Sequence, residues 1–319
     1  MSPLAIAATG LRKSYPGKDG AKTVLDGVDL AVPEGTIFSL LGPNGAGKTT
    51  TVQILSTLIP ADGGTVQVAG HDLNRQADDV RGAIGVTGQY SAVDKLLTGE
   101  ENLLLMADLW HLSRRDGKRK AADLLERFDL VEAARKPAST YSGGMRRRLD
   151  LAMTLVGDPR LIFLDEPTTG LDPRSRRGMW QIVRGLVEDG VTIFLTTQYL
   201  EEADELADRI ALLDHGRLIA EGTSEELKRL IPGGHIELTF ADARLLGAAR
   251  DAVGTGIADA GALTLRVPSD GGVHAVRELL VLLDGRSIDV AEMSVHTPDL
   301  DDVFLTLTGN QDQQKEPVR

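Results

Sequence analysis

The stretch from Thr36 to Lys48 constrains the fold more than any other part of this chain. An apolar segment, TIFSLL, is followed by the glycine-rich GPNGAGKTT and then by the helix-like TVQILSTL. The order strand, glycine loop, helix, with the spacing Gly42-x4-Gly47-Lys48-Thr49, matches a phosphate-binding P-loop, in which small residues let backbone N–H groups point at phosphate oxygens. Lys48 is expected to reach the terminal phosphates, and Thr49 is expected to offer its hydroxyl to Mg²⁺. The residues expected to bind are Gly42, Pro43, Asn44, Gly45, Ala46, Gly47, Lys48, Thr49 and Thr50.

Two adjacent acids follow another apolar segment in RLIFLDEPTTGLD. Leu161 to Leu164 read as a buried strand that ends directly before Asp165 and Glu166. Because parallel strands bind ligands beyond their carboxyl ends, we expect both carboxylates at the same sheet edge as the glycine loop. Asp165 suits a role in holding Mg²⁺ through its water shell, and Glu166 suits a general base that polarises water toward the terminal phosphate. The alternative is an acidic N-cap for the next helix.

Between these two motifs, residues 90–157 or so are rich in helical apolar periodicity and charge, which predicts an inserted helical subdomain. Within it, YSGGMRRRLDLAMTL places Ser142, Gly143 and Gly144 at the start of a helix, where an anion is favoured. A nucleotide needs only one P-loop, so this second anion site is explained if it covers the nucleotide held by another subunit. The alternative is an ordinary serine N-cap. The arginines at 146–148 either balance phosphate, pair with acids across a dimer, or face solvent.

The composition excludes several classes of function. With 35 Lys and Arg against 47 Asp and Glu, the formal net charge is −12, and an acidic chain repels phosphate backbones and anionic lipid. We therefore expect no nucleic-acid partner and no direct attachment to a bare bilayer. The 319 residues include no cysteine, and the six histidines lack ligand spacing, so no thiolate or histidine metal site is expected. The N-terminus does not resemble a secretory signal, and no apolar run reaches the 18 or so residues of a membrane span.

Four motifs in register resemble the ATP-binding subunit of ABC transporters. They are the P-loop at 42–50, the signature YSGGM at 141–145, the Walker B strand LIFLDE at 161–166 and the D-loop GLD at 170–172. The resemblance covers roughly the first 230 residues, and the order and spacing of the motifs all agree. It implies a head-to-tail homodimer in which two chains sandwich two ATP molecules, each P-loop facing the partner's signature. ATP-driven closure would then move a separate membrane permease.

The resemblance also gives different roles to the two Gln-Tyr pairs of the chain. Gln89, in VTGQY, falls at the family's Q-loop, which senses Mg²⁺ and contacts the membrane partner. Gln198, in TTQYLEEAD, falls where most members carry a switch histidine that contacts the terminal phosphate; glutamine keeps donors and an acceptor but cannot titrate. These segments are similar to those of the daunorubicin/doxorubicin-resistance type of ATP-binding protein. Tyr15 is the candidate for the aromatic residue that stacks on adenine; the alternative is an ordinary loop aromatic.

A second, smaller module is expected beyond Pro232, where the pattern changes after SEELKRLIPGG. HIELTF and ALTLRV alternate like strands, ARLLGAARDAV and VHAVRELLVLL read as helices, and IDVAEMSV is strand-like. This pattern predicts a small α+β sandwich of ferredoxin-like type at 232–309, after an ATP-binding domain at 1–231. The closing DLDDVFLTLTG reads as a helix that docks on the ATPase domain or its dimer mate, and 310–319 as a disordered tail.

The sequence therefore predicts a fold of the α/β P-loop NTPase class with a helical insertion and a C-terminal α+β domain. It predicts an ATP hydrolase that uses Mg²⁺, with Glu166, Gln198 and Lys48 in catalysis, and with Thr49, Gln89 and Asp165 at the metal. The expected setting is the cytoplasmic face of a membrane, with a separate permease contacting an exported, anthracycline-like compound. Two other classes stay open: a soluble ABC ATPase acting on ribosomes or DNA, and the ATPase of an importer.

Overall fold

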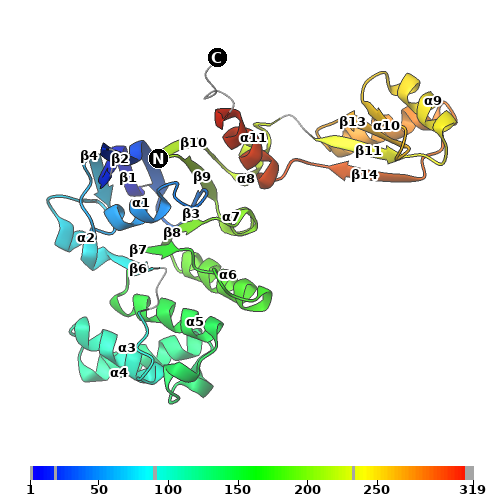
Figure 1. The fold of residues 1–319 in the computed structure, drawn as a ribbon. Coiled ribbons are helices and arrows are strands. Elements are labelled where there is room, and N and C mark those ends of the chain that lie inside the picture. The colour runs from blue at the N-terminus through cyan, green and yellow to red at the C-terminus, as the bar shows by residue number, and fades with distance from the viewer. Residues whose placement is uncertain (1–2, 18–19, 89–91, 232–233, 313–319) are drawn as a thin grey trace. The chain divides into compact units, whose positions relative to one another are not determined.

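The computed structural model describes residues 3–17, 20–88, 92–231 and 234–312 (Figure 1). The chain packs as two compact units, Met1–Ser224 and Glu225–Arg319, each of which is described by itself. The sequence placed the division near Pro232, which lies outside the described residues. Within the described ranges, none of the helices combines the length and the apolar character needed to cross a bilayer.

The centre of the first unit is a six-stranded sheet that is parallel except at one edge. The strand order is β10-β9-β3-β8-β7-β6, and only β10 runs antiparallel to its neighbour β9. The strands are β3 (Ile37–Leu41), β6 (Ile84–Thr87), β7 (Leu161–Asp165), β8 (Thr192–Thr197), β9 (Arg209–Asp214) and β10 (Arg217–Gly222). Every residue of β3, β7 and β8 is buried, because both faces of a parallel sheet are covered.

Alternate side chains of these strands enter two different cores. On one face, Phe38, Phe163 and Phe194 of β3, β7 and β8 pack together, with ring centroids 5.6 Å apart in each neighbouring pair. This core also takes in α1 (Lys48–Leu55) and a four-stranded antiparallel sheet of order β2-β1-β4-β5. Those strands are β1 (Leu4–Gly17), β2 (Gly20–Pro33), β4 (Gly63–Val68) and β5 (His71–Asp72), and the short α2 (Ala77–Ala83) precedes β6.

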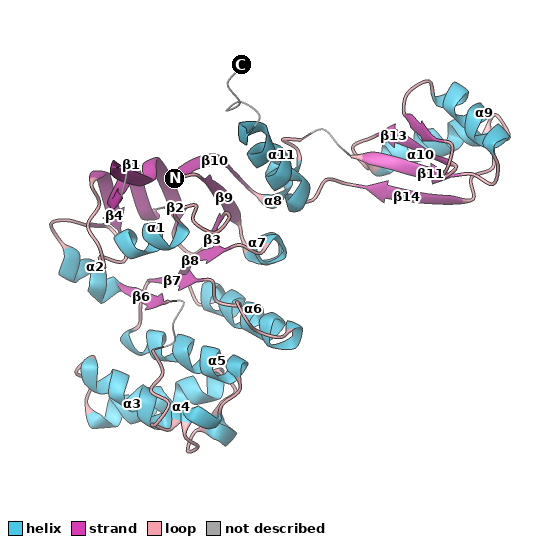
Figure 2. Ribbon diagram, in the orientation of Figure 1, coloured by secondary structure: helices cyan, strands magenta, loops and turns pink. Residues whose placement is uncertain are grey.

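The opposite face of the central sheet carries the helical part of the unit, which Figure 2 shows as helices gathered beyond β6. Its elements are α3 (Gly99–Leu109), α4 (Arg114–Arg127), α5 (Gly143–Thr154) and the 3₁₀ turns Val131–Ala133, Ala138–Thr140 and Leu155–Gly157. The helix α3 begins with a capping box, in which Thr98 accepts from the Glu101 amide and the Glu101 carboxylate accepts from the Thr98 amide. This interval is the one that the sequence predicted to be helical.

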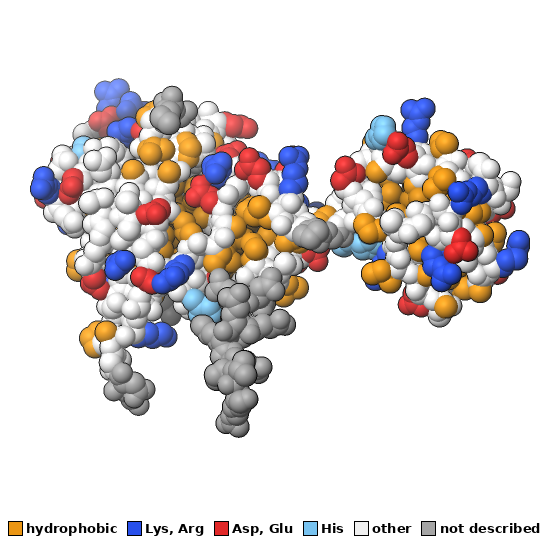
Figure 3. Space-filling model, turned by 90° about the horizontal axis from the view of Figure 1, so that it is seen from above, with side chains coloured by type: hydrophobic (Ala, Val, Ile, Leu, Met, Phe, Trp, Pro, Cys, Tyr) orange, Lys and Arg blue, Asp and Glu red, His pale blue; other side chains and the backbone are white. Residues whose placement is uncertain are grey.

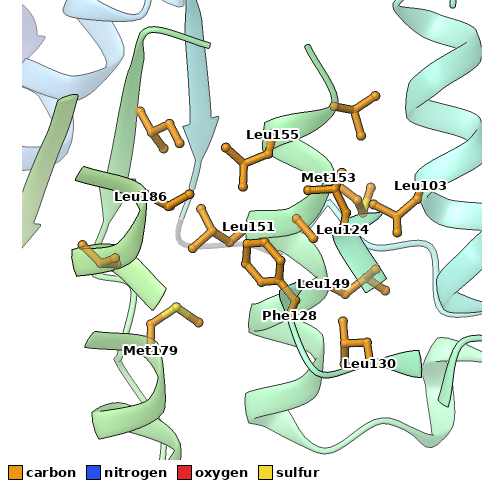
Figure 4. Packing of buried hydrophobic residues seen from close by; sticks show 14 of the residues in the cluster. Leu103, Leu124, Phe128, Leu130, Leu149, Leu151, Met153, Leu155, Met179 and Leu186 are labelled. Atoms are coloured by element: carbon orange, nitrogen blue, oxygen red, sulfur yellow. The ribbon is translucent and has the colours of Figure 1, made fainter. Parts of the chain in front are cut away.

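The helix α5 is the central element of this second core. In Figure 4, Leu151 lies on the side of α5 toward Leu186 of α6 (Pro173–Glu188), as does Leu155 directly after the helix, and Leu149 and Met153 lie on the side toward α3 and α4. All four of these side chains are buried. Since α5 contacts α3, α4 and α6 at once, it is held between the helical part and the sheet-covering helix α6.

The second unit contains a four-stranded antiparallel sheet of order β12-β13-β11-β14. Its elements follow in the chain as β11 (His235–Thr239), α9 (Ala243–Val253), β12 (Ile257–Asp259), β13 (Thr264–Pro268), α10 (Val273–Asp284) and β14 (Glu292–His296). This is the β-α-β-β-α-β connectivity of a ferredoxin-like fold. The sequence predicted the ferredoxin-like type, but with only three of the four strands. The sequence missed β12, because its three exposed residues show no alternation.

One face of this sheet forms the core of the second unit. Ile236 and Leu238 of β11 pack with Leu265 of β13 and with α9 and α10. The unit also includes α8 (Ser224–Lys228), which begins at the boundary, and a closing helix α11 (Leu300–Asp312) in which Leu300 and Val303 are buried. The helix includes three residues of the stretch that was expected to be a disordered tail. Acidic and basic side chains are interspersed on the face of each unit seen in Figure 3.

Candidate active site

The glycine loop lies between the end of β3 and the start of α1, in the order that the sequence predicted. Gly47 is the N-cap of α1 with φ of 112°, and Gly45 has φ of 83°, a region that residues with a Cβ rarely adopt. At Gly42 a Cβ would lie 2.2 Å from the carbonyl oxygen of Leu213, so this position has no room for a side chain. The loop therefore requires glycine at these positions for backbone reasons, and it is shaped as a cradle for phosphate.

Lys48 is folded back over this loop. Its Nζ donates to the carbonyl oxygens of Gly42 at 2.8 Å and Pro43 at 3.1 Å, and lies 3.7 Å from Oε1 of Glu166. The side chain is buried, and burial lowers the pKa of Lys48 while Glu166 and Asp165 partly offset this effect. The ammonium group is thus positioned between the loop and the two acids.

Asp165 and Thr49 bring oxygen ligands together at the same sheet edge. Asp165 ends β7 and continues the alternation of Leu161 and Phe163, so its carboxylate lies on the α1 side of the sheet. Its Oδ1 lies 3.4 Å from Thr49 Oγ1 and also accepts from the hydroxyl of Thr196. A hydroxyl and a carboxylate are hard donors that fit Mg²⁺ shared with substrate phosphates. Among the described residues, this edge included, no three His, Asp or Glu side chains gather as a metal cluster, so the two oxygens would share Mg²⁺ with substrate phosphates and water.

Glu166 follows β7 directly and has an unusual backbone conformation. Its φ is 50°, in the left-handed region, and its amide donates to the carbonyl oxygen of Thr196 on β8 at 3.0 Å. Positive φ in a residue with a side chain is costly and tends to occur at functional sites. The turn places one carboxylate oxygen toward Lys48 and the other 3.4 Å from Thr169 Oγ1. The alternative of an acidic N-cap does not apply to Glu166, since the next helix, α6, is capped by Asp172.

The second predicted anion site, Ser142 to Gly144, is at the start of α5. Ser142 is the N-cap, and its Oγ accepts from the Met145 amide at 3.2 Å. A Cβ at Gly144 would lie 2.7 Å from Oγ of Ser175 on α6, so α5 and α6 approach closely there. A Cβ at Gly143 would instead meet Leu171, in the segment before α6, at 3.8 Å. Binding of a phosphate by this helix start stays a prediction.

Three other predicted residues have different outcomes. Gln198 lies between β8 and α7 (Leu200–Leu206), at the sheet edge that holds Asp165 and Glu166. Tyr15 is on β1, and its half-exposed ring has Lys13 Nζ 5.5 Å from its centroid. Gln89 lies outside the described residues. Adenine stacking by Tyr15 and the metal role of Gln89 stay predictions.

The three consecutive arginines have three different environments. Arg146 donates to the carbonyl oxygen of Tyr141, and Arg148 donates to the carbonyl oxygen of Phe128 and to the Asp129 carboxylate. Of the three, only Arg147 reaches the loop that carries Glu166, where it donates to the carbonyl oxygens of Asp165 and Pro167. The Arg147 side chain is only 11% exposed, so the interpretation of the run as a solvated face is wrong for this residue.

Sequence reasoning missed Glu202, a fully buried acid on α7. Its Oε1 accepts from Thr168 Oγ1 at 2.7 Å and from Trp180 Nε1 at 3.1 Å. Burial raises the pKa of Glu202, and hydrogen bonds from Thr197, Thr168 and Trp180 and the charge of Arg176 only partly offset this. Through its hydrogen bond with Thr168, Glu202 connects the segment after β7 to α7. The helix α7 begins two residues after Gln198. In the sequence, Glu202 lies in LEEADE, a run of acids that looks solvent-exposed, so no pattern indicated that its side chain is buried.

Known proteins share both the motifs and the fold. The ABC transporter family matches residues 25–169. The daunorubicin resistance ATP-binding protein DrrA2 of Streptomyces coeruleorubidus is 48% identical and covers 99% of this chain and 98% of its own. The Nod factor export ATP-binding protein I of Sinorhizobium fredii is 37% identical over 97% of this chain and 88% of its own.

A solved dimeric ATP-binding cassette, bound to ADP and Pi in a post-hydrolysis state, aligns with a TM-score of 0.62 and 27% identity over 68% of this chain and 98% of its own. The site and the fold therefore define a nucleotide-binding P-loop protein. The chain belongs to the ATP-binding subunits of the ABC transporter family, and it is an ATPase of that class.

The buried Glu202 gives a prediction for stability against pH. Between its ordinary value of 4.5 and its raised folded pKa, the folded protein binds more protons than the unfolded chain, so the free energy of unfolding falls as pH rises. Glu202→Gln keeps an oxygen for Thr168 and Trp180 and removes the titration. The melting temperature of this variant should fall less than that of the unchanged protein as pH rises from about 5 to about 8.

The matched control is Glu205→Gln, which changes a half-exposed carboxylate on the same helix that pairs with Arg184. The melting temperatures of all three proteins are measured by thermal unfolding at several pH values. Parallel curves for Glu202→Gln and the unchanged protein would mean that Glu202 does not carry this pH dependence.

Proposed function

We propose that this chain is the ATP-hydrolysing subunit of an exporter for hydrophobic drug-like compounds, acting as a pair of copies attached to a separate permease at the cytoplasmic face of a membrane. The observation that carries the proposal is the meeting of Lys48, Thr49, Asp165 and Glu166 at one sheet edge. Relatives with this full-length similarity are named as resistance or export ATP-binding proteins. Those printed names support export over import.

The geometry assigns a task to each residue of the site. Bound Mg²⁺ would neutralise charge on the ATP phosphates, and Thr49 and Asp165 are the residues that would hold it. Lys48 would exchange the carbonyl oxygens of Gly42 and Pro43 for phosphate oxygens, since these carbonyls are its present partners. Glu166 would accept a proton from the attacking water, which strengthens attack on the terminal phosphorus. Gln198 would orient the phosphate or the water through its amide without titrating.

Two features support a pair of copies that share each ATP. The N-terminus of α5 at Ser142 is a second helix start suited to phosphate, and it lies beside α6. A solved cassette of 27% identity is dimeric and holds ADP and Pi. Each Ser142 to Gly144 segment would therefore cover the nucleotide that the P-loop of the other copy binds.

Replacing the proposed base tests the hydrolysis mechanism. Glu166→Gln should lower ATP turnover about 100-fold or more, because the amide cannot accept the proton from water. Its affinity for ATP should be preserved, since Lys48 and the glycine loop are unchanged. Phosphate release measures turnover, and equilibrium binding of a fluorescent ATP analogue measures affinity.

The controls are Lys48→Met, which should lose ATP affinity as well as turnover, and Glu188→Gln, an exposed acid on α6 that should change neither. Turnover by Glu166→Gln within about threefold of the unchanged protein would refute the assignment of the base.

Isolation of the trapped complex tests the exporter assignment. Tagged Glu166→Gln protein is purified from detergent-solubilised native membranes with Mg²⁺ and ATP present, and copurifying proteins are identified by mass spectrometry. We expect a multi-span membrane protein in defined ratio to the chain. Recovery of ribosomal or DNA-repair proteins, with no integral membrane protein, would contradict the exporter assignment and leave the ATPase assignment in place.

A further inference from the structure

Arg147 contacts the backbone on both sides of the proposed base. Its Nε donates to the carbonyl oxygen of Pro167 at 2.9 Å, and its Nη2 donates to that of Asp165 at 3.2 Å. The residue between these two carbonyls is Glu166. A guanidinium group on α5 therefore holds the chain immediately before and after the proposed base.

The same side chain also contacts Gly88, the residue directly before a segment with a predicted role. Nη1 of Arg147 donates to the carbonyl oxygen of Gly88 at 2.9 Å and lies 3.4 Å from Oδ2 of Asp150, one turn further along α5. The other oxygen of Asp150 accepts from the amide of Ala92 at 3.0 Å. Gly88 and Ala92 are the described residues on either side of 89–91, the segment that contains Gln89. The ion pair thus holds both flanks of that segment.

The chemistry of the pair suits a rigid connection. Arg147 presents several donors in a fixed planar fork, which a lysine cannot reproduce. Burial lowers the pKa of Arg147, while the carboxylates of Asp150, Asp165 and Glu202 partly offset this, and an arginine stays charged throughout the physiological range. Asp150 is 4% exposed, so water has little access to the ion pair and competes weakly for its hydrogen bonds.

The helix that carries the pair begins at the predicted signature. Ser142 caps α5 five residues before Arg147, and the apolar side chains of α5 are packed against three other helices (Figure 4). A packed helix moves as a body, so a displacement of its N-terminus also displaces Arg147 and Asp150.

We propose that Arg147 and Asp150 form a positioning pair for ATP hydrolysis, which fixes the loop around Glu166 and the flanks of residues 89–91 relative to the helix that begins at Ser142. This proposal rests on the proposed role of Glu166 as the base, because the pair acts through that residue. The pair sets the geometry of water attack and couples it to the position of α5. Its loss leaves the glycine loop and Lys48 untouched.

The chain offers a matched control on the same helix. Arg148 also has a partly buried side chain and also donates to a backbone carbonyl and a carboxylate. Its partners, Phe128 and Asp129, lie in the helical part and not in the loop that carries Glu166. Arg148→Met therefore removes an equivalent set of contacts without touching residues 165–167 or the flanks of 89–91.

The experiment compares kcat and ATP affinity in purified Arg147→Met, Arg147→Lys, Asp150→Asn and Arg148→Met. We expect Arg147→Met to lower kcat about 10- to 100-fold, since a small misplacement of the base is costly. Its Kd for ATP should stay within about threefold, because the P-loop is intact. Arg147→Lys and Asp150→Asn should lose less, and Arg148→Met should stay within about twofold of the unchanged protein.

The double variant Arg147→Met with Asp150→Asn should be no slower than Arg147→Met alone, because the two residues act as one unit. A double variant whose loss of kcat equals the product of the two single losses would overturn the proposal. So would equal losses in Arg147→Met and Arg148→Met, or a loss that appears in Kd and not in kcat. If Arg147→Met fails to fold, Arg147→Lys and Asp150→Asn decide the question by the same split between kcat and Kd.

Failure of this proposal is distinguishable from failure of the proposed function. Full turnover by Glu166→Gln would refute the role of Glu166 as the base, whatever the Arg147 variants do. Loss of turnover in Glu166→Gln, with kcat unchanged in the Arg147 and Asp150 variants, would refute the positioning pair alone.

Discussion

The parallel pairing of β3, β8 and β7 is the constraint on which the rest of the site depends. Backbone hydrogen bonding in register brings the carboxyl ends of these strands to one edge of the sheet. The glycine loop, Gln198 and Glu166 follow those ends directly, and Asp165 is the last residue of β7. Alternation along each strand then decides that Asp165 lies on the α1 side, where Thr49 is found. Strand order thus brings the groups of the site together.

The helical part is attached to this edge by polar contacts as well as by its apolar core. The core covers the far face of the sheet and holds α5 between α3, α4 and α6. Arg147 adds hydrogen bonds to the carbonyls around Glu166, and Glu202 joins Thr168 to α7 from the other direction. The proposed base thus lies in a loop whose conformation, including the positive φ of Glu166, is set by neighbours from separate elements.

Much of the fold and the centre of the site could be predicted from the sequence. The glycine spacing identified the loop, the apolar run before Asp165 identified β7, and the alternating and helical segments of the second unit predicted its ferredoxin-like type, with β12 missed. Interactions between distant segments could not be predicted in this way. Three adjacent arginines look identical in sequence, but only the packing of α5 decides that Arg147 turns inward. Glu202 is buried for the same reason, since its partners come from two other segments.

The most direct test of the account is whether ATP joins two copies of the chain. Light scattering coupled to size-exclusion chromatography would measure the mass of Glu166→Gln protein with and without Mg²⁺ and ATP. We expect the mass of one chain without nucleotide and of two chains with ATP, because each Ser142 helix start would cover the nucleotide of the other copy. An unchanged single-chain mass at saturating ATP would contradict it.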